Sequence, residues 1–126
     1  MKIEFKPSWH VRTAYSDFYE YMKKEGYIDT YHQLFTYAFL IGTKSIMEGG
    51  TLSSDLPKNG DLFMIQNVTP SNLEVITGIA AFLLKESINS EEIFKRVLDI
   101  ADFGITLLKT SLELDKGNLL LDTVID

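Results

Sequence analysis

Two histidines are the first residues in this sequence that could do chemistry, because imidazole binds metal ions and transfers protons near neutral pH. Asp29 and His32 are three positions apart, so they would share one side of a helix. A metal site needs three or four ligands in a defined geometry. His10 and Asp17 would complete such a set only if the fold brought them to His32. A small metal-dependent enzyme is therefore the last of three functional alternatives.

Paired carboxylates are the second feature, since they can bind a hard cation or exchange protons. Asp99 and Asp102 are three apart in one predicted helix, and Glu113 and Asp115 follow. Their positions on the polar side of that helix favour a solvated face.

The segment from 53 to 60 contains hydroxyl, carboxyl and amine groups but no known catalytic pattern. Ser53, Ser54 and Asp55 have no histidine nearby and no strand–turn–helix elbow around them. Lys58-Asn59-Gly60 is typical of a turn, because the GxxxxGK[ST] pattern of a phosphate-binding loop is missing. We therefore predict no catalytic residues, no bound metal and no cofactor.

The composition predicts one soluble domain over residues 1–126, located in the cytoplasm. The chain has a net charge of −6 and no cysteine, so disulfides and thiol chemistry are excluded. No secretory signal and no apolar run of about 18–20 residues is present, which argues against membrane insertion. Basic side chains outnumber acidic ones only in residues 1–24, which leaves a small DNA-associated module as the second alternative.

The candidate side chains named above must be positioned by the fold, which we expect to be organised around a central helix over Thr30–Glu48. One face carries Leu34, Phe35, Ala38 and Phe39, and a second face carries Tyr37, Leu40, Ile41 and Met47. A helix that is apolar on both sides is usually buried on both sides, and it lies on a surface only where a partner covers it. Thr30 and Gln33 have the spacing of a capping box, and Gly49-Gly50 ends the helix.

Three further helices complete the expected fold, which is a compact, mainly α four-helix domain. They span approximately 13–24, 70–86 and 89–114, with start signals at Thr69-Pro70 and at Asn89. Ala101 and Gly104 are small, so another helix could approach the last one closely. Alternating or apolar runs predict two or three short strands near 2–6, 62–67 and 119–125.

Aromatic residues and an exposed loop are the candidates for a contact surface. Aromatic side chains are enriched at the centres of protein interfaces, and the turn-rich loop 49–60 could dock a partner. The predicted contact residues are Trp9, Tyr21, Lys23, Lys24, Tyr37 and Leu56. The alternative is that these aromatic rings belong to the core, with their polar atoms at its edge.

Three segments together resemble a known group of proteins. They are YHQLFTYAFLIGTKSIMEGG (Tyr31–Gly50), DLFMIQNVTP (Asp61–Pro70) and DIADFGITLLK (Asp99–Lys109). This pattern of apolar helices with glycines is similar to small accessory proteins encoded beside prokaryotic genome-defence systems, notably those of the DNA-phosphorothioation neighbourhood. The resemblance covers residues 31–109 and carries over no catalytic residue. It implies a non-enzymatic subunit of a multi-protein bacterial complex.

The first functional expectation is accordingly a non-catalytic interaction or adaptor subunit in a genome- or phage-defence complex. We expect a protein partner or self-association, and nucleic acid only through a larger complex.

Overall fold

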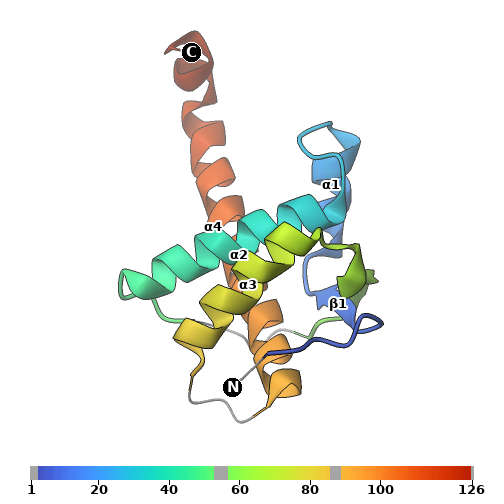
Figure 1. Cartoon of the computed structure of the whole chain (residues 1–126). Helices are drawn as coiled ribbons and strands as arrows, with labels where there is room; N and C mark the ends of the chain where they lie inside the picture. Colours follow the sequence, from blue (N-terminus) through green and yellow to red (C-terminus); the bar gives the residue numbers. More distant parts are fainter. Residues whose placement is uncertain (1–2, 53–56, 86–88, 126) are drawn as a thin grey trace.

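The computed structural model describes residues 3–52, 57–85 and 89–125. The elements in this part of the chain are β1 (His10–Thr13), α1 (Ser16–Lys24), α2 (Tyr31–Met47), β2 (Gly60–Met64), the 3-10 helix η1 (Ile65–Asn67), α3 (Pro70–Leu83) and α4 (Ser90–Ile125). The predicted mainly α fold with four helices is confirmed. In Figure 1, α3 lies in front of α2 and α4 crosses behind it.

The core forms mainly where α2 crosses α4. Leu34, Phe35, Ala38 and Phe39 of α2 are buried there, and α4 contributes Val97, Ile100, Ala101 and Ile105. This inner face of α2 is the first of the two apolar faces predicted from the sequence.

Two glycines let the backbones of α2 and α4 come into contact. A Cβ atom on Gly104 would overlap the carbonyl oxygen of Ala38, and one on Gly42 would overlap the carbonyl oxygen of Ile100. No side chain can therefore replace either hydrogen without moving a helix. The close approach predicted at Ala101 and Gly104 is confirmed.

The predicted helix starts are also observed. Thr30 Oγ1 accepts a hydrogen bond from the Gln33 N–H at 3.3 Å, and the Gln33 side chain accepts one from the Asp29 N–H at 2.9 Å. Thr69 caps α3 in the same way, and Asn89 Oδ1 accepts from the Glu92 N–H at 2.8 Å. These side chains satisfy amide groups that have no partner within the helix.

The strand predictions were correct in only one of three places. Residues 62–64 lie in β2, although η1 replaces the strand after Met64. The expected strand near 2–6 is wrong for residues 3–6, which have no regular structure. Their alternating apolar side chains dock instead: the Phe5 ring lies 5.1 Å from that of Phe94, and the Glu4 N–H donates to Ser90 Oγ.

The partner of β2 is β1, over residues where we predicted no strand. The two strands pair antiparallel, with Val11 opposite Phe63 and an irregular register between Val11 and Arg12. Val11 and Thr13 are buried while His10 and Arg12 are exposed, which is the alternation of a strand with one covered face.

The expected strand at 119–125 is also wrong, because α4 continues to Ile125. Adding residues to a formed helix is much easier than starting a new element, so Gly117 does not interrupt it. Within the described part of the chain, no helix is both long and apolar enough to cross a membrane.

Gly104→Ala tests the contact between α2 and α4. We expect the free energy of unfolding to fall by about 3 kcal/mol, because the added methyl group forces the two backbones apart. Chemical denaturation of dilute protein measures the change.

Gly78→Ala is the matched control, since a Cβ atom there would have no heavy atom of the described part of the chain within 4 Å. We expect it to stabilise the chain by up to about 1 kcal/mol through helix propensity. Equal effects of the two substitutions would contradict the close crossing.

Candidate functional site

The structure does not assemble the metal set considered from the sequence. His10 Nδ1 lies 3.0 Å from Asp61 Oδ1 across the small sheet, and the His32 ring packs edge-on against Phe63. The three or more histidine or acidic side chains that a metal ion would need are not clustered anywhere in the described residues. The strand pairing explains this difference, because it gives His10 a different carboxylate from the expected Asp17 or Asp29.

Asp99 and Asp102 do not form the solvated face that we expected. Lys58 Nζ lies 2.7 Å from Asp99 Oδ1 and 3.4 Å from Asp102 Oδ2. Asp102 is only 6% exposed, and the Lys58 side chain is 16% exposed. A carboxylate can be buried when a cation and hydrogen-bond donors compensate for lost hydration, and Lys58 supplies the cation.

The end of β1 supplies the remaining donors to Asp102. Thr13 Oγ1 donates to Asp102 Oδ1 at 2.5 Å, and the Ala14 N–H donates to Oδ2 at 2.9 Å. Hydrogen bonds to an ionised carboxylate are among the stronger ones in proteins. The buried charge cluster, which we define as Thr13, Ala14, Lys58, Asp99 and Asp102, therefore fastens β1 and the segment before β2 to α4.

The pKa of Lys58 reflects its two carboxylate partners. Burial by itself would lower this pKa, but the hydrogen bond to Asp99 and the charges of Asp102 and Asp99 outweigh that effect. The pKa of the ammonium group is therefore raised above its ordinary value, and Lys58 stays charged at neutral pH.

Tyr19 lies close enough to Asp102 for the carboxylate charge to affect the pKa of its phenol. Its ring is fully buried, and its hydroxyl group has no hydrogen-bond partner among the described residues. Burial first, and then the charge of Asp102, raises the pKa of the phenol above its ordinary value. Tyr19 is therefore held neutral by its surroundings.

Sequence reasoning missed this cluster, although one signal was present. Asp102 follows Leu98 by four positions and precedes Ile105 by three, so it falls within the buried stripe of α4. A carboxylate in such a stripe requires a partner. Nothing in the sequence identified Lys58 as that partner, because the contact depends on the path of the chain between α2 and β2.

The predicted contact residues lie on separate parts of the molecule. Trp9 packs its ring 5.1 Å from Phe94 and 6.1 Å from Phe5, which ties the N-terminal segment to α4. These contacts within the chain explain why an aromatic side chain occupies position 9. Leu56 lies outside the described residues.

Tyr21, Lys23 and Lys24 lie on α1, whereas Tyr37 lies on α2. Tyr21 is 44% exposed and has the rings of Phe18 and Tyr27 beside it. Lys23 Nζ lies 5.0 Å from the centre of the Tyr31 ring, a cation–π contact. Their role in binding stays a prediction.

The basic residues proposed for DNA contact are distributed over three segments. Lys6 precedes β1, Arg12 lies on β1, and Lys23 and Lys24 end α1. Lys2 lies outside the described residues. The DNA-associated alternative also stays a prediction.

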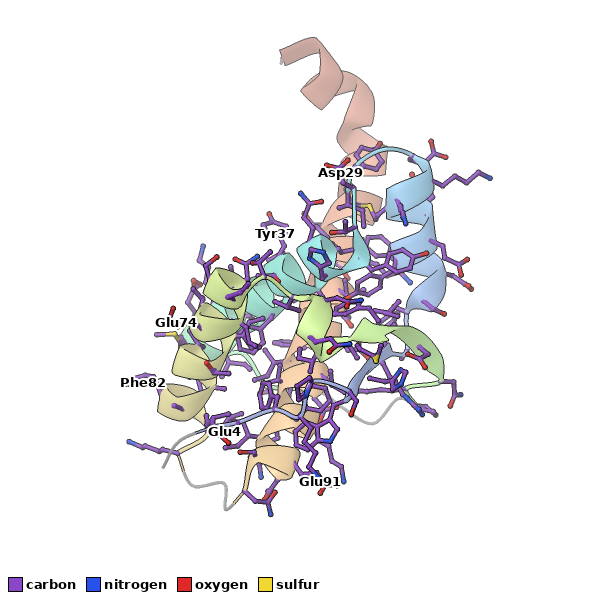
Figure 2. The ribbon with its side chains drawn as sticks, turned by 45° about the vertical axis from the view of Figure 1, so that its right-hand side comes forward. Glu4, Asp29, Tyr37, Glu74, Phe82 and Glu91 are labelled. Carbon is purple, nitrogen blue, oxygen red and sulfur yellow. The ribbon has the colours of Figure 1, made fainter. Side chains whose placement is uncertain are left out.

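Tyr37 is one of several exposed apolar side chains on α2 and α3. Along α2, Tyr37 is 57% exposed and Met47 is 65% exposed, and Leu40 lies between them; on α3, Val75 and Phe82 are exposed as well. We call these five residues the α2–α3 face. Figure 2 shows Tyr37 and Phe82 on the side of the molecule where α3 lies. The prediction that α2 is buried on both sides is wrong for the isolated chain, because α3 does not cover the second face.

A shallow hollow of about 520 Å³ adjoins this face between α2 and the start of α3. Its lining includes Tyr37 and Leu40 together with polar side chains: Asp29, Thr30, His32, Gln33, Thr36 and Asn72. Protein–protein contacts combine apolar and polar groups in the same way.

Comparisons with known proteins give no counterpart for this arrangement: no family model, curated protein or solved structure matches the chain significantly.

Lys58→Met tests the buried charge cluster. Removing the cation leaves two carboxylates uncompensated, so we expect the free energy of unfolding to fall by about 3 kcal/mol at neutral pH. Lys95→Met is the control, because its ion pair with Glu91 is largely exposed and should contribute less than about 0.5 kcal/mol. Similar losses of stability in both variants would show that the buried charge cluster contributes no more than an exposed ion pair.

Tyr19→Phe tests the buried phenol. The variant should be about 1 kcal/mol more stable at neutral pH, because it removes a buried hydroxyl group without a partner. In the parent chain, the unfolded state loses the phenol proton above about pH 10 while the folded state retains it, so stability falls as the pH rises.

The variant should lose less stability than the parent between neutral pH and this alkaline range. Thermal unfolding at several pH values measures the difference, and Tyr27→Phe, at a position 66% exposed, should change neither quantity. A parallel alkaline loss in the parent and in Tyr19→Phe would contradict the assignment.

Proposed function

We propose that this chain is a non-catalytic interaction subunit that binds a protein partner at the α2–α3 face. The observation that carries the proposal is the second apolar face of α2, where Tyr37, Leu40 and Met47 are exposed. Exposing the second apolar face of a helix to water is unfavourable. A bound partner would remove this unfavourable free energy, at about 25 cal/mol for each Å² of apolar area buried.

The hollow beside Tyr37 supports the same proposal. An aromatic or branched side chain of a partner would find an apolar wall at Tyr37 and Leu40, with hydrogen-bonding groups on Gln33 and Asn72 around it. Interfaces depend most on a few anchoring side chains that enter such recesses while a polar rim excludes water.

The most buried ionic groups have a structural explanation that does not involve substrate. Lys58 is held by Asp99 and Asp102, and both oxygens of Asp102 accept hydrogen bonds from the chain itself. This supports a subunit that acts through its surface. The resemblance of residues 31–109 to accessory proteins of prokaryotic genome-defence systems extends the proposal to a multi-protein bacterial complex of that kind.

Site-specific photo-crosslinking in the native host tests the proposal, because the reaction joins the chain to whichever protein lies against the substituted position. A benzophenone amino acid at position 37 should give a covalent adduct, since the ring would lie inside the contact. The same amino acid at position 95, which is exposed on α4, is the control and should give little product.

The mass of the adduct identifies the class of partner. An adduct that is not a multiple of the 14.3 kDa chain would show a different protein at the α2–α3 face. No adduct at position 37, or equal yields at both positions, would contradict the proposal.

A further inference from the structure

The segment that leads into β2 contains an asparagine followed by a glycine. Asn59 is exposed and lies in a stretch without regular structure, and Gly60 is the first residue of β2. Among the described residues, the Asn59 side chain has no hydrogen-bond partner. Asn89, in contrast, uses its side-chain oxygen to cap α4. The fold therefore gives the side-chain amide of Asn59 no role that would hold it in one position.

The backbone nitrogen of the residue after an asparagine can attack the side-chain amide of that asparagine. Glycine gives the best access to this nitrogen, because it has no Cβ atom beside it. The pairing of β2 with β1 begins at Gly60, opposite Thr13, so Asn59 lies outside the ladder and Gly60 lies at its end. The ends of ordered elements open more readily than their centres, and each opening makes the Gly60 nitrogen available for attack.

Asn67 shows how an exposed asparagine close by in the chain is protected. It is exposed too, but the next residue is Val68, whose β-branched side chain crowds the backbone nitrogen. The Val68 N–H also donates a hydrogen bond to the carbonyl oxygen of Ile65 at 3.1 Å. Gly60 has no side chain to crowd its nitrogen, so Asn59 and Asn67 should differ in reactivity although both are exposed.

We propose that Asn59 is a site of spontaneous deamidation, in which the Gly60 nitrogen attacks the side-chain amide. This nitrogen loses its proton to water and bonds to Cγ of Asn59, and the amide nitrogen leaves as ammonia. Water then opens the succinimide ring: cleavage of the new bond leaves aspartate at position 59, and cleavage of the original peptide bond leaves isoaspartate, whose backbone runs through Cβ and Cγ. The net reaction consumes one water and releases one ammonia, with no oxidation or reduction.

Both products act on the buried charge cluster, because Lys58 precedes Asn59. Lys58 is the one cation of this cluster and already contacts the carboxylates of Asp99 and Asp102, so a further negative charge beside it is unfavourable. Isoaspartate also adds one carbon to the backbone before Gly60. There is little room at Gly60, where a Cβ atom would lie 2.5 Å from Cβ of Ser16. Deamidation therefore weakens the attachment of β2 to α4, an effect that does not depend on the proposed interaction function.

Ageing of the purified, folded chain at mildly alkaline pH tests the site. Peptide mapping by mass spectrometry should show aspartate and isoaspartate at position 59, while Asn67 stays an amide. The aged chain should unfold at a temperature about 3 °C lower than the fresh chain, which corresponds to a modest loss of stability at this chain length. Asn59→Gln is the matched variant, since glutamine would have to form a larger and less favourable ring. It should show neither the modification nor the shift.

Asn59→Asp separates the added charge from the longer backbone, because it makes one product directly. It should lower the unfolding temperature by less than isoaspartate does. An Asn59 that persists as long as Asn67 in the folded chain would overturn the proposed site, as would conversion only after unfolding in denaturant. Complete conversion with an unchanged unfolding temperature would overturn the effect on the buried charge cluster.

Discussion

The backbone contact between α2 and α4 is the constraint on which the rest of this structure depends. At Gly42 and Gly104 the helices touch without side chains between them, so the flanking side chains interdigitate and form most of the core. Core packing is sensitive to a single methyl group. The crossing therefore sets where every other element must lie.

The buried charge cluster attaches the remaining elements to this pair of helices. Asp102 lies on α4 close to the crossing, and it holds the end of β1 through Thr13 and Ala14 and the segment before β2 through Lys58. Hydrogen bonds are directional, whereas hydrophobic attraction is not. The buried charge cluster therefore fixes the positions of β1 and of the segment before β2 relative to α4 more closely than apolar contacts alone would.

The helices of this molecule are not equally buried, and the apolar side chains left exposed are the basis of the functional proposal. The inner face of α2 is buried against one side of the first half of α4, but α3 covers α2 incompletely and exposes apolar side chains of its own. Exposed apolar residues scattered singly are ordinary on soluble proteins, whereas a contiguous apolar patch indicates a binding surface. The hollow beside Tyr37 is the part of these exposed helices with a distinct shape.

Much of the fold was predictable from the sequence because its signals are local. The caps at Thr30, Thr69 and Asn89, the helical spacing of apolar residues and the small residues of α4 each act within a few positions of the chain. The small sheet was harder to predict, since strand pairing joins residues far apart in the sequence: residues 3–6 and 10–13 both alternate, and only the second segment meets β2. The helical end of α4 was missed because an apolar run such as 119–125 suits a strand or a helix equally well.

The candidate site depended still more on tertiary structure. The sequence by itself determined that α2 has two apolar faces and that Ala101 and Gly104 are small residues within the last helix. Only the tertiary structure decided which of these faces is covered, that Gly104 meets a backbone while Gly78 meets open space, and that Lys58 neutralises Asp102. The physical reason is that periodicity reports which side of a helix is apolar, whereas burial and ion pairing depend on which distant segment packs against that side.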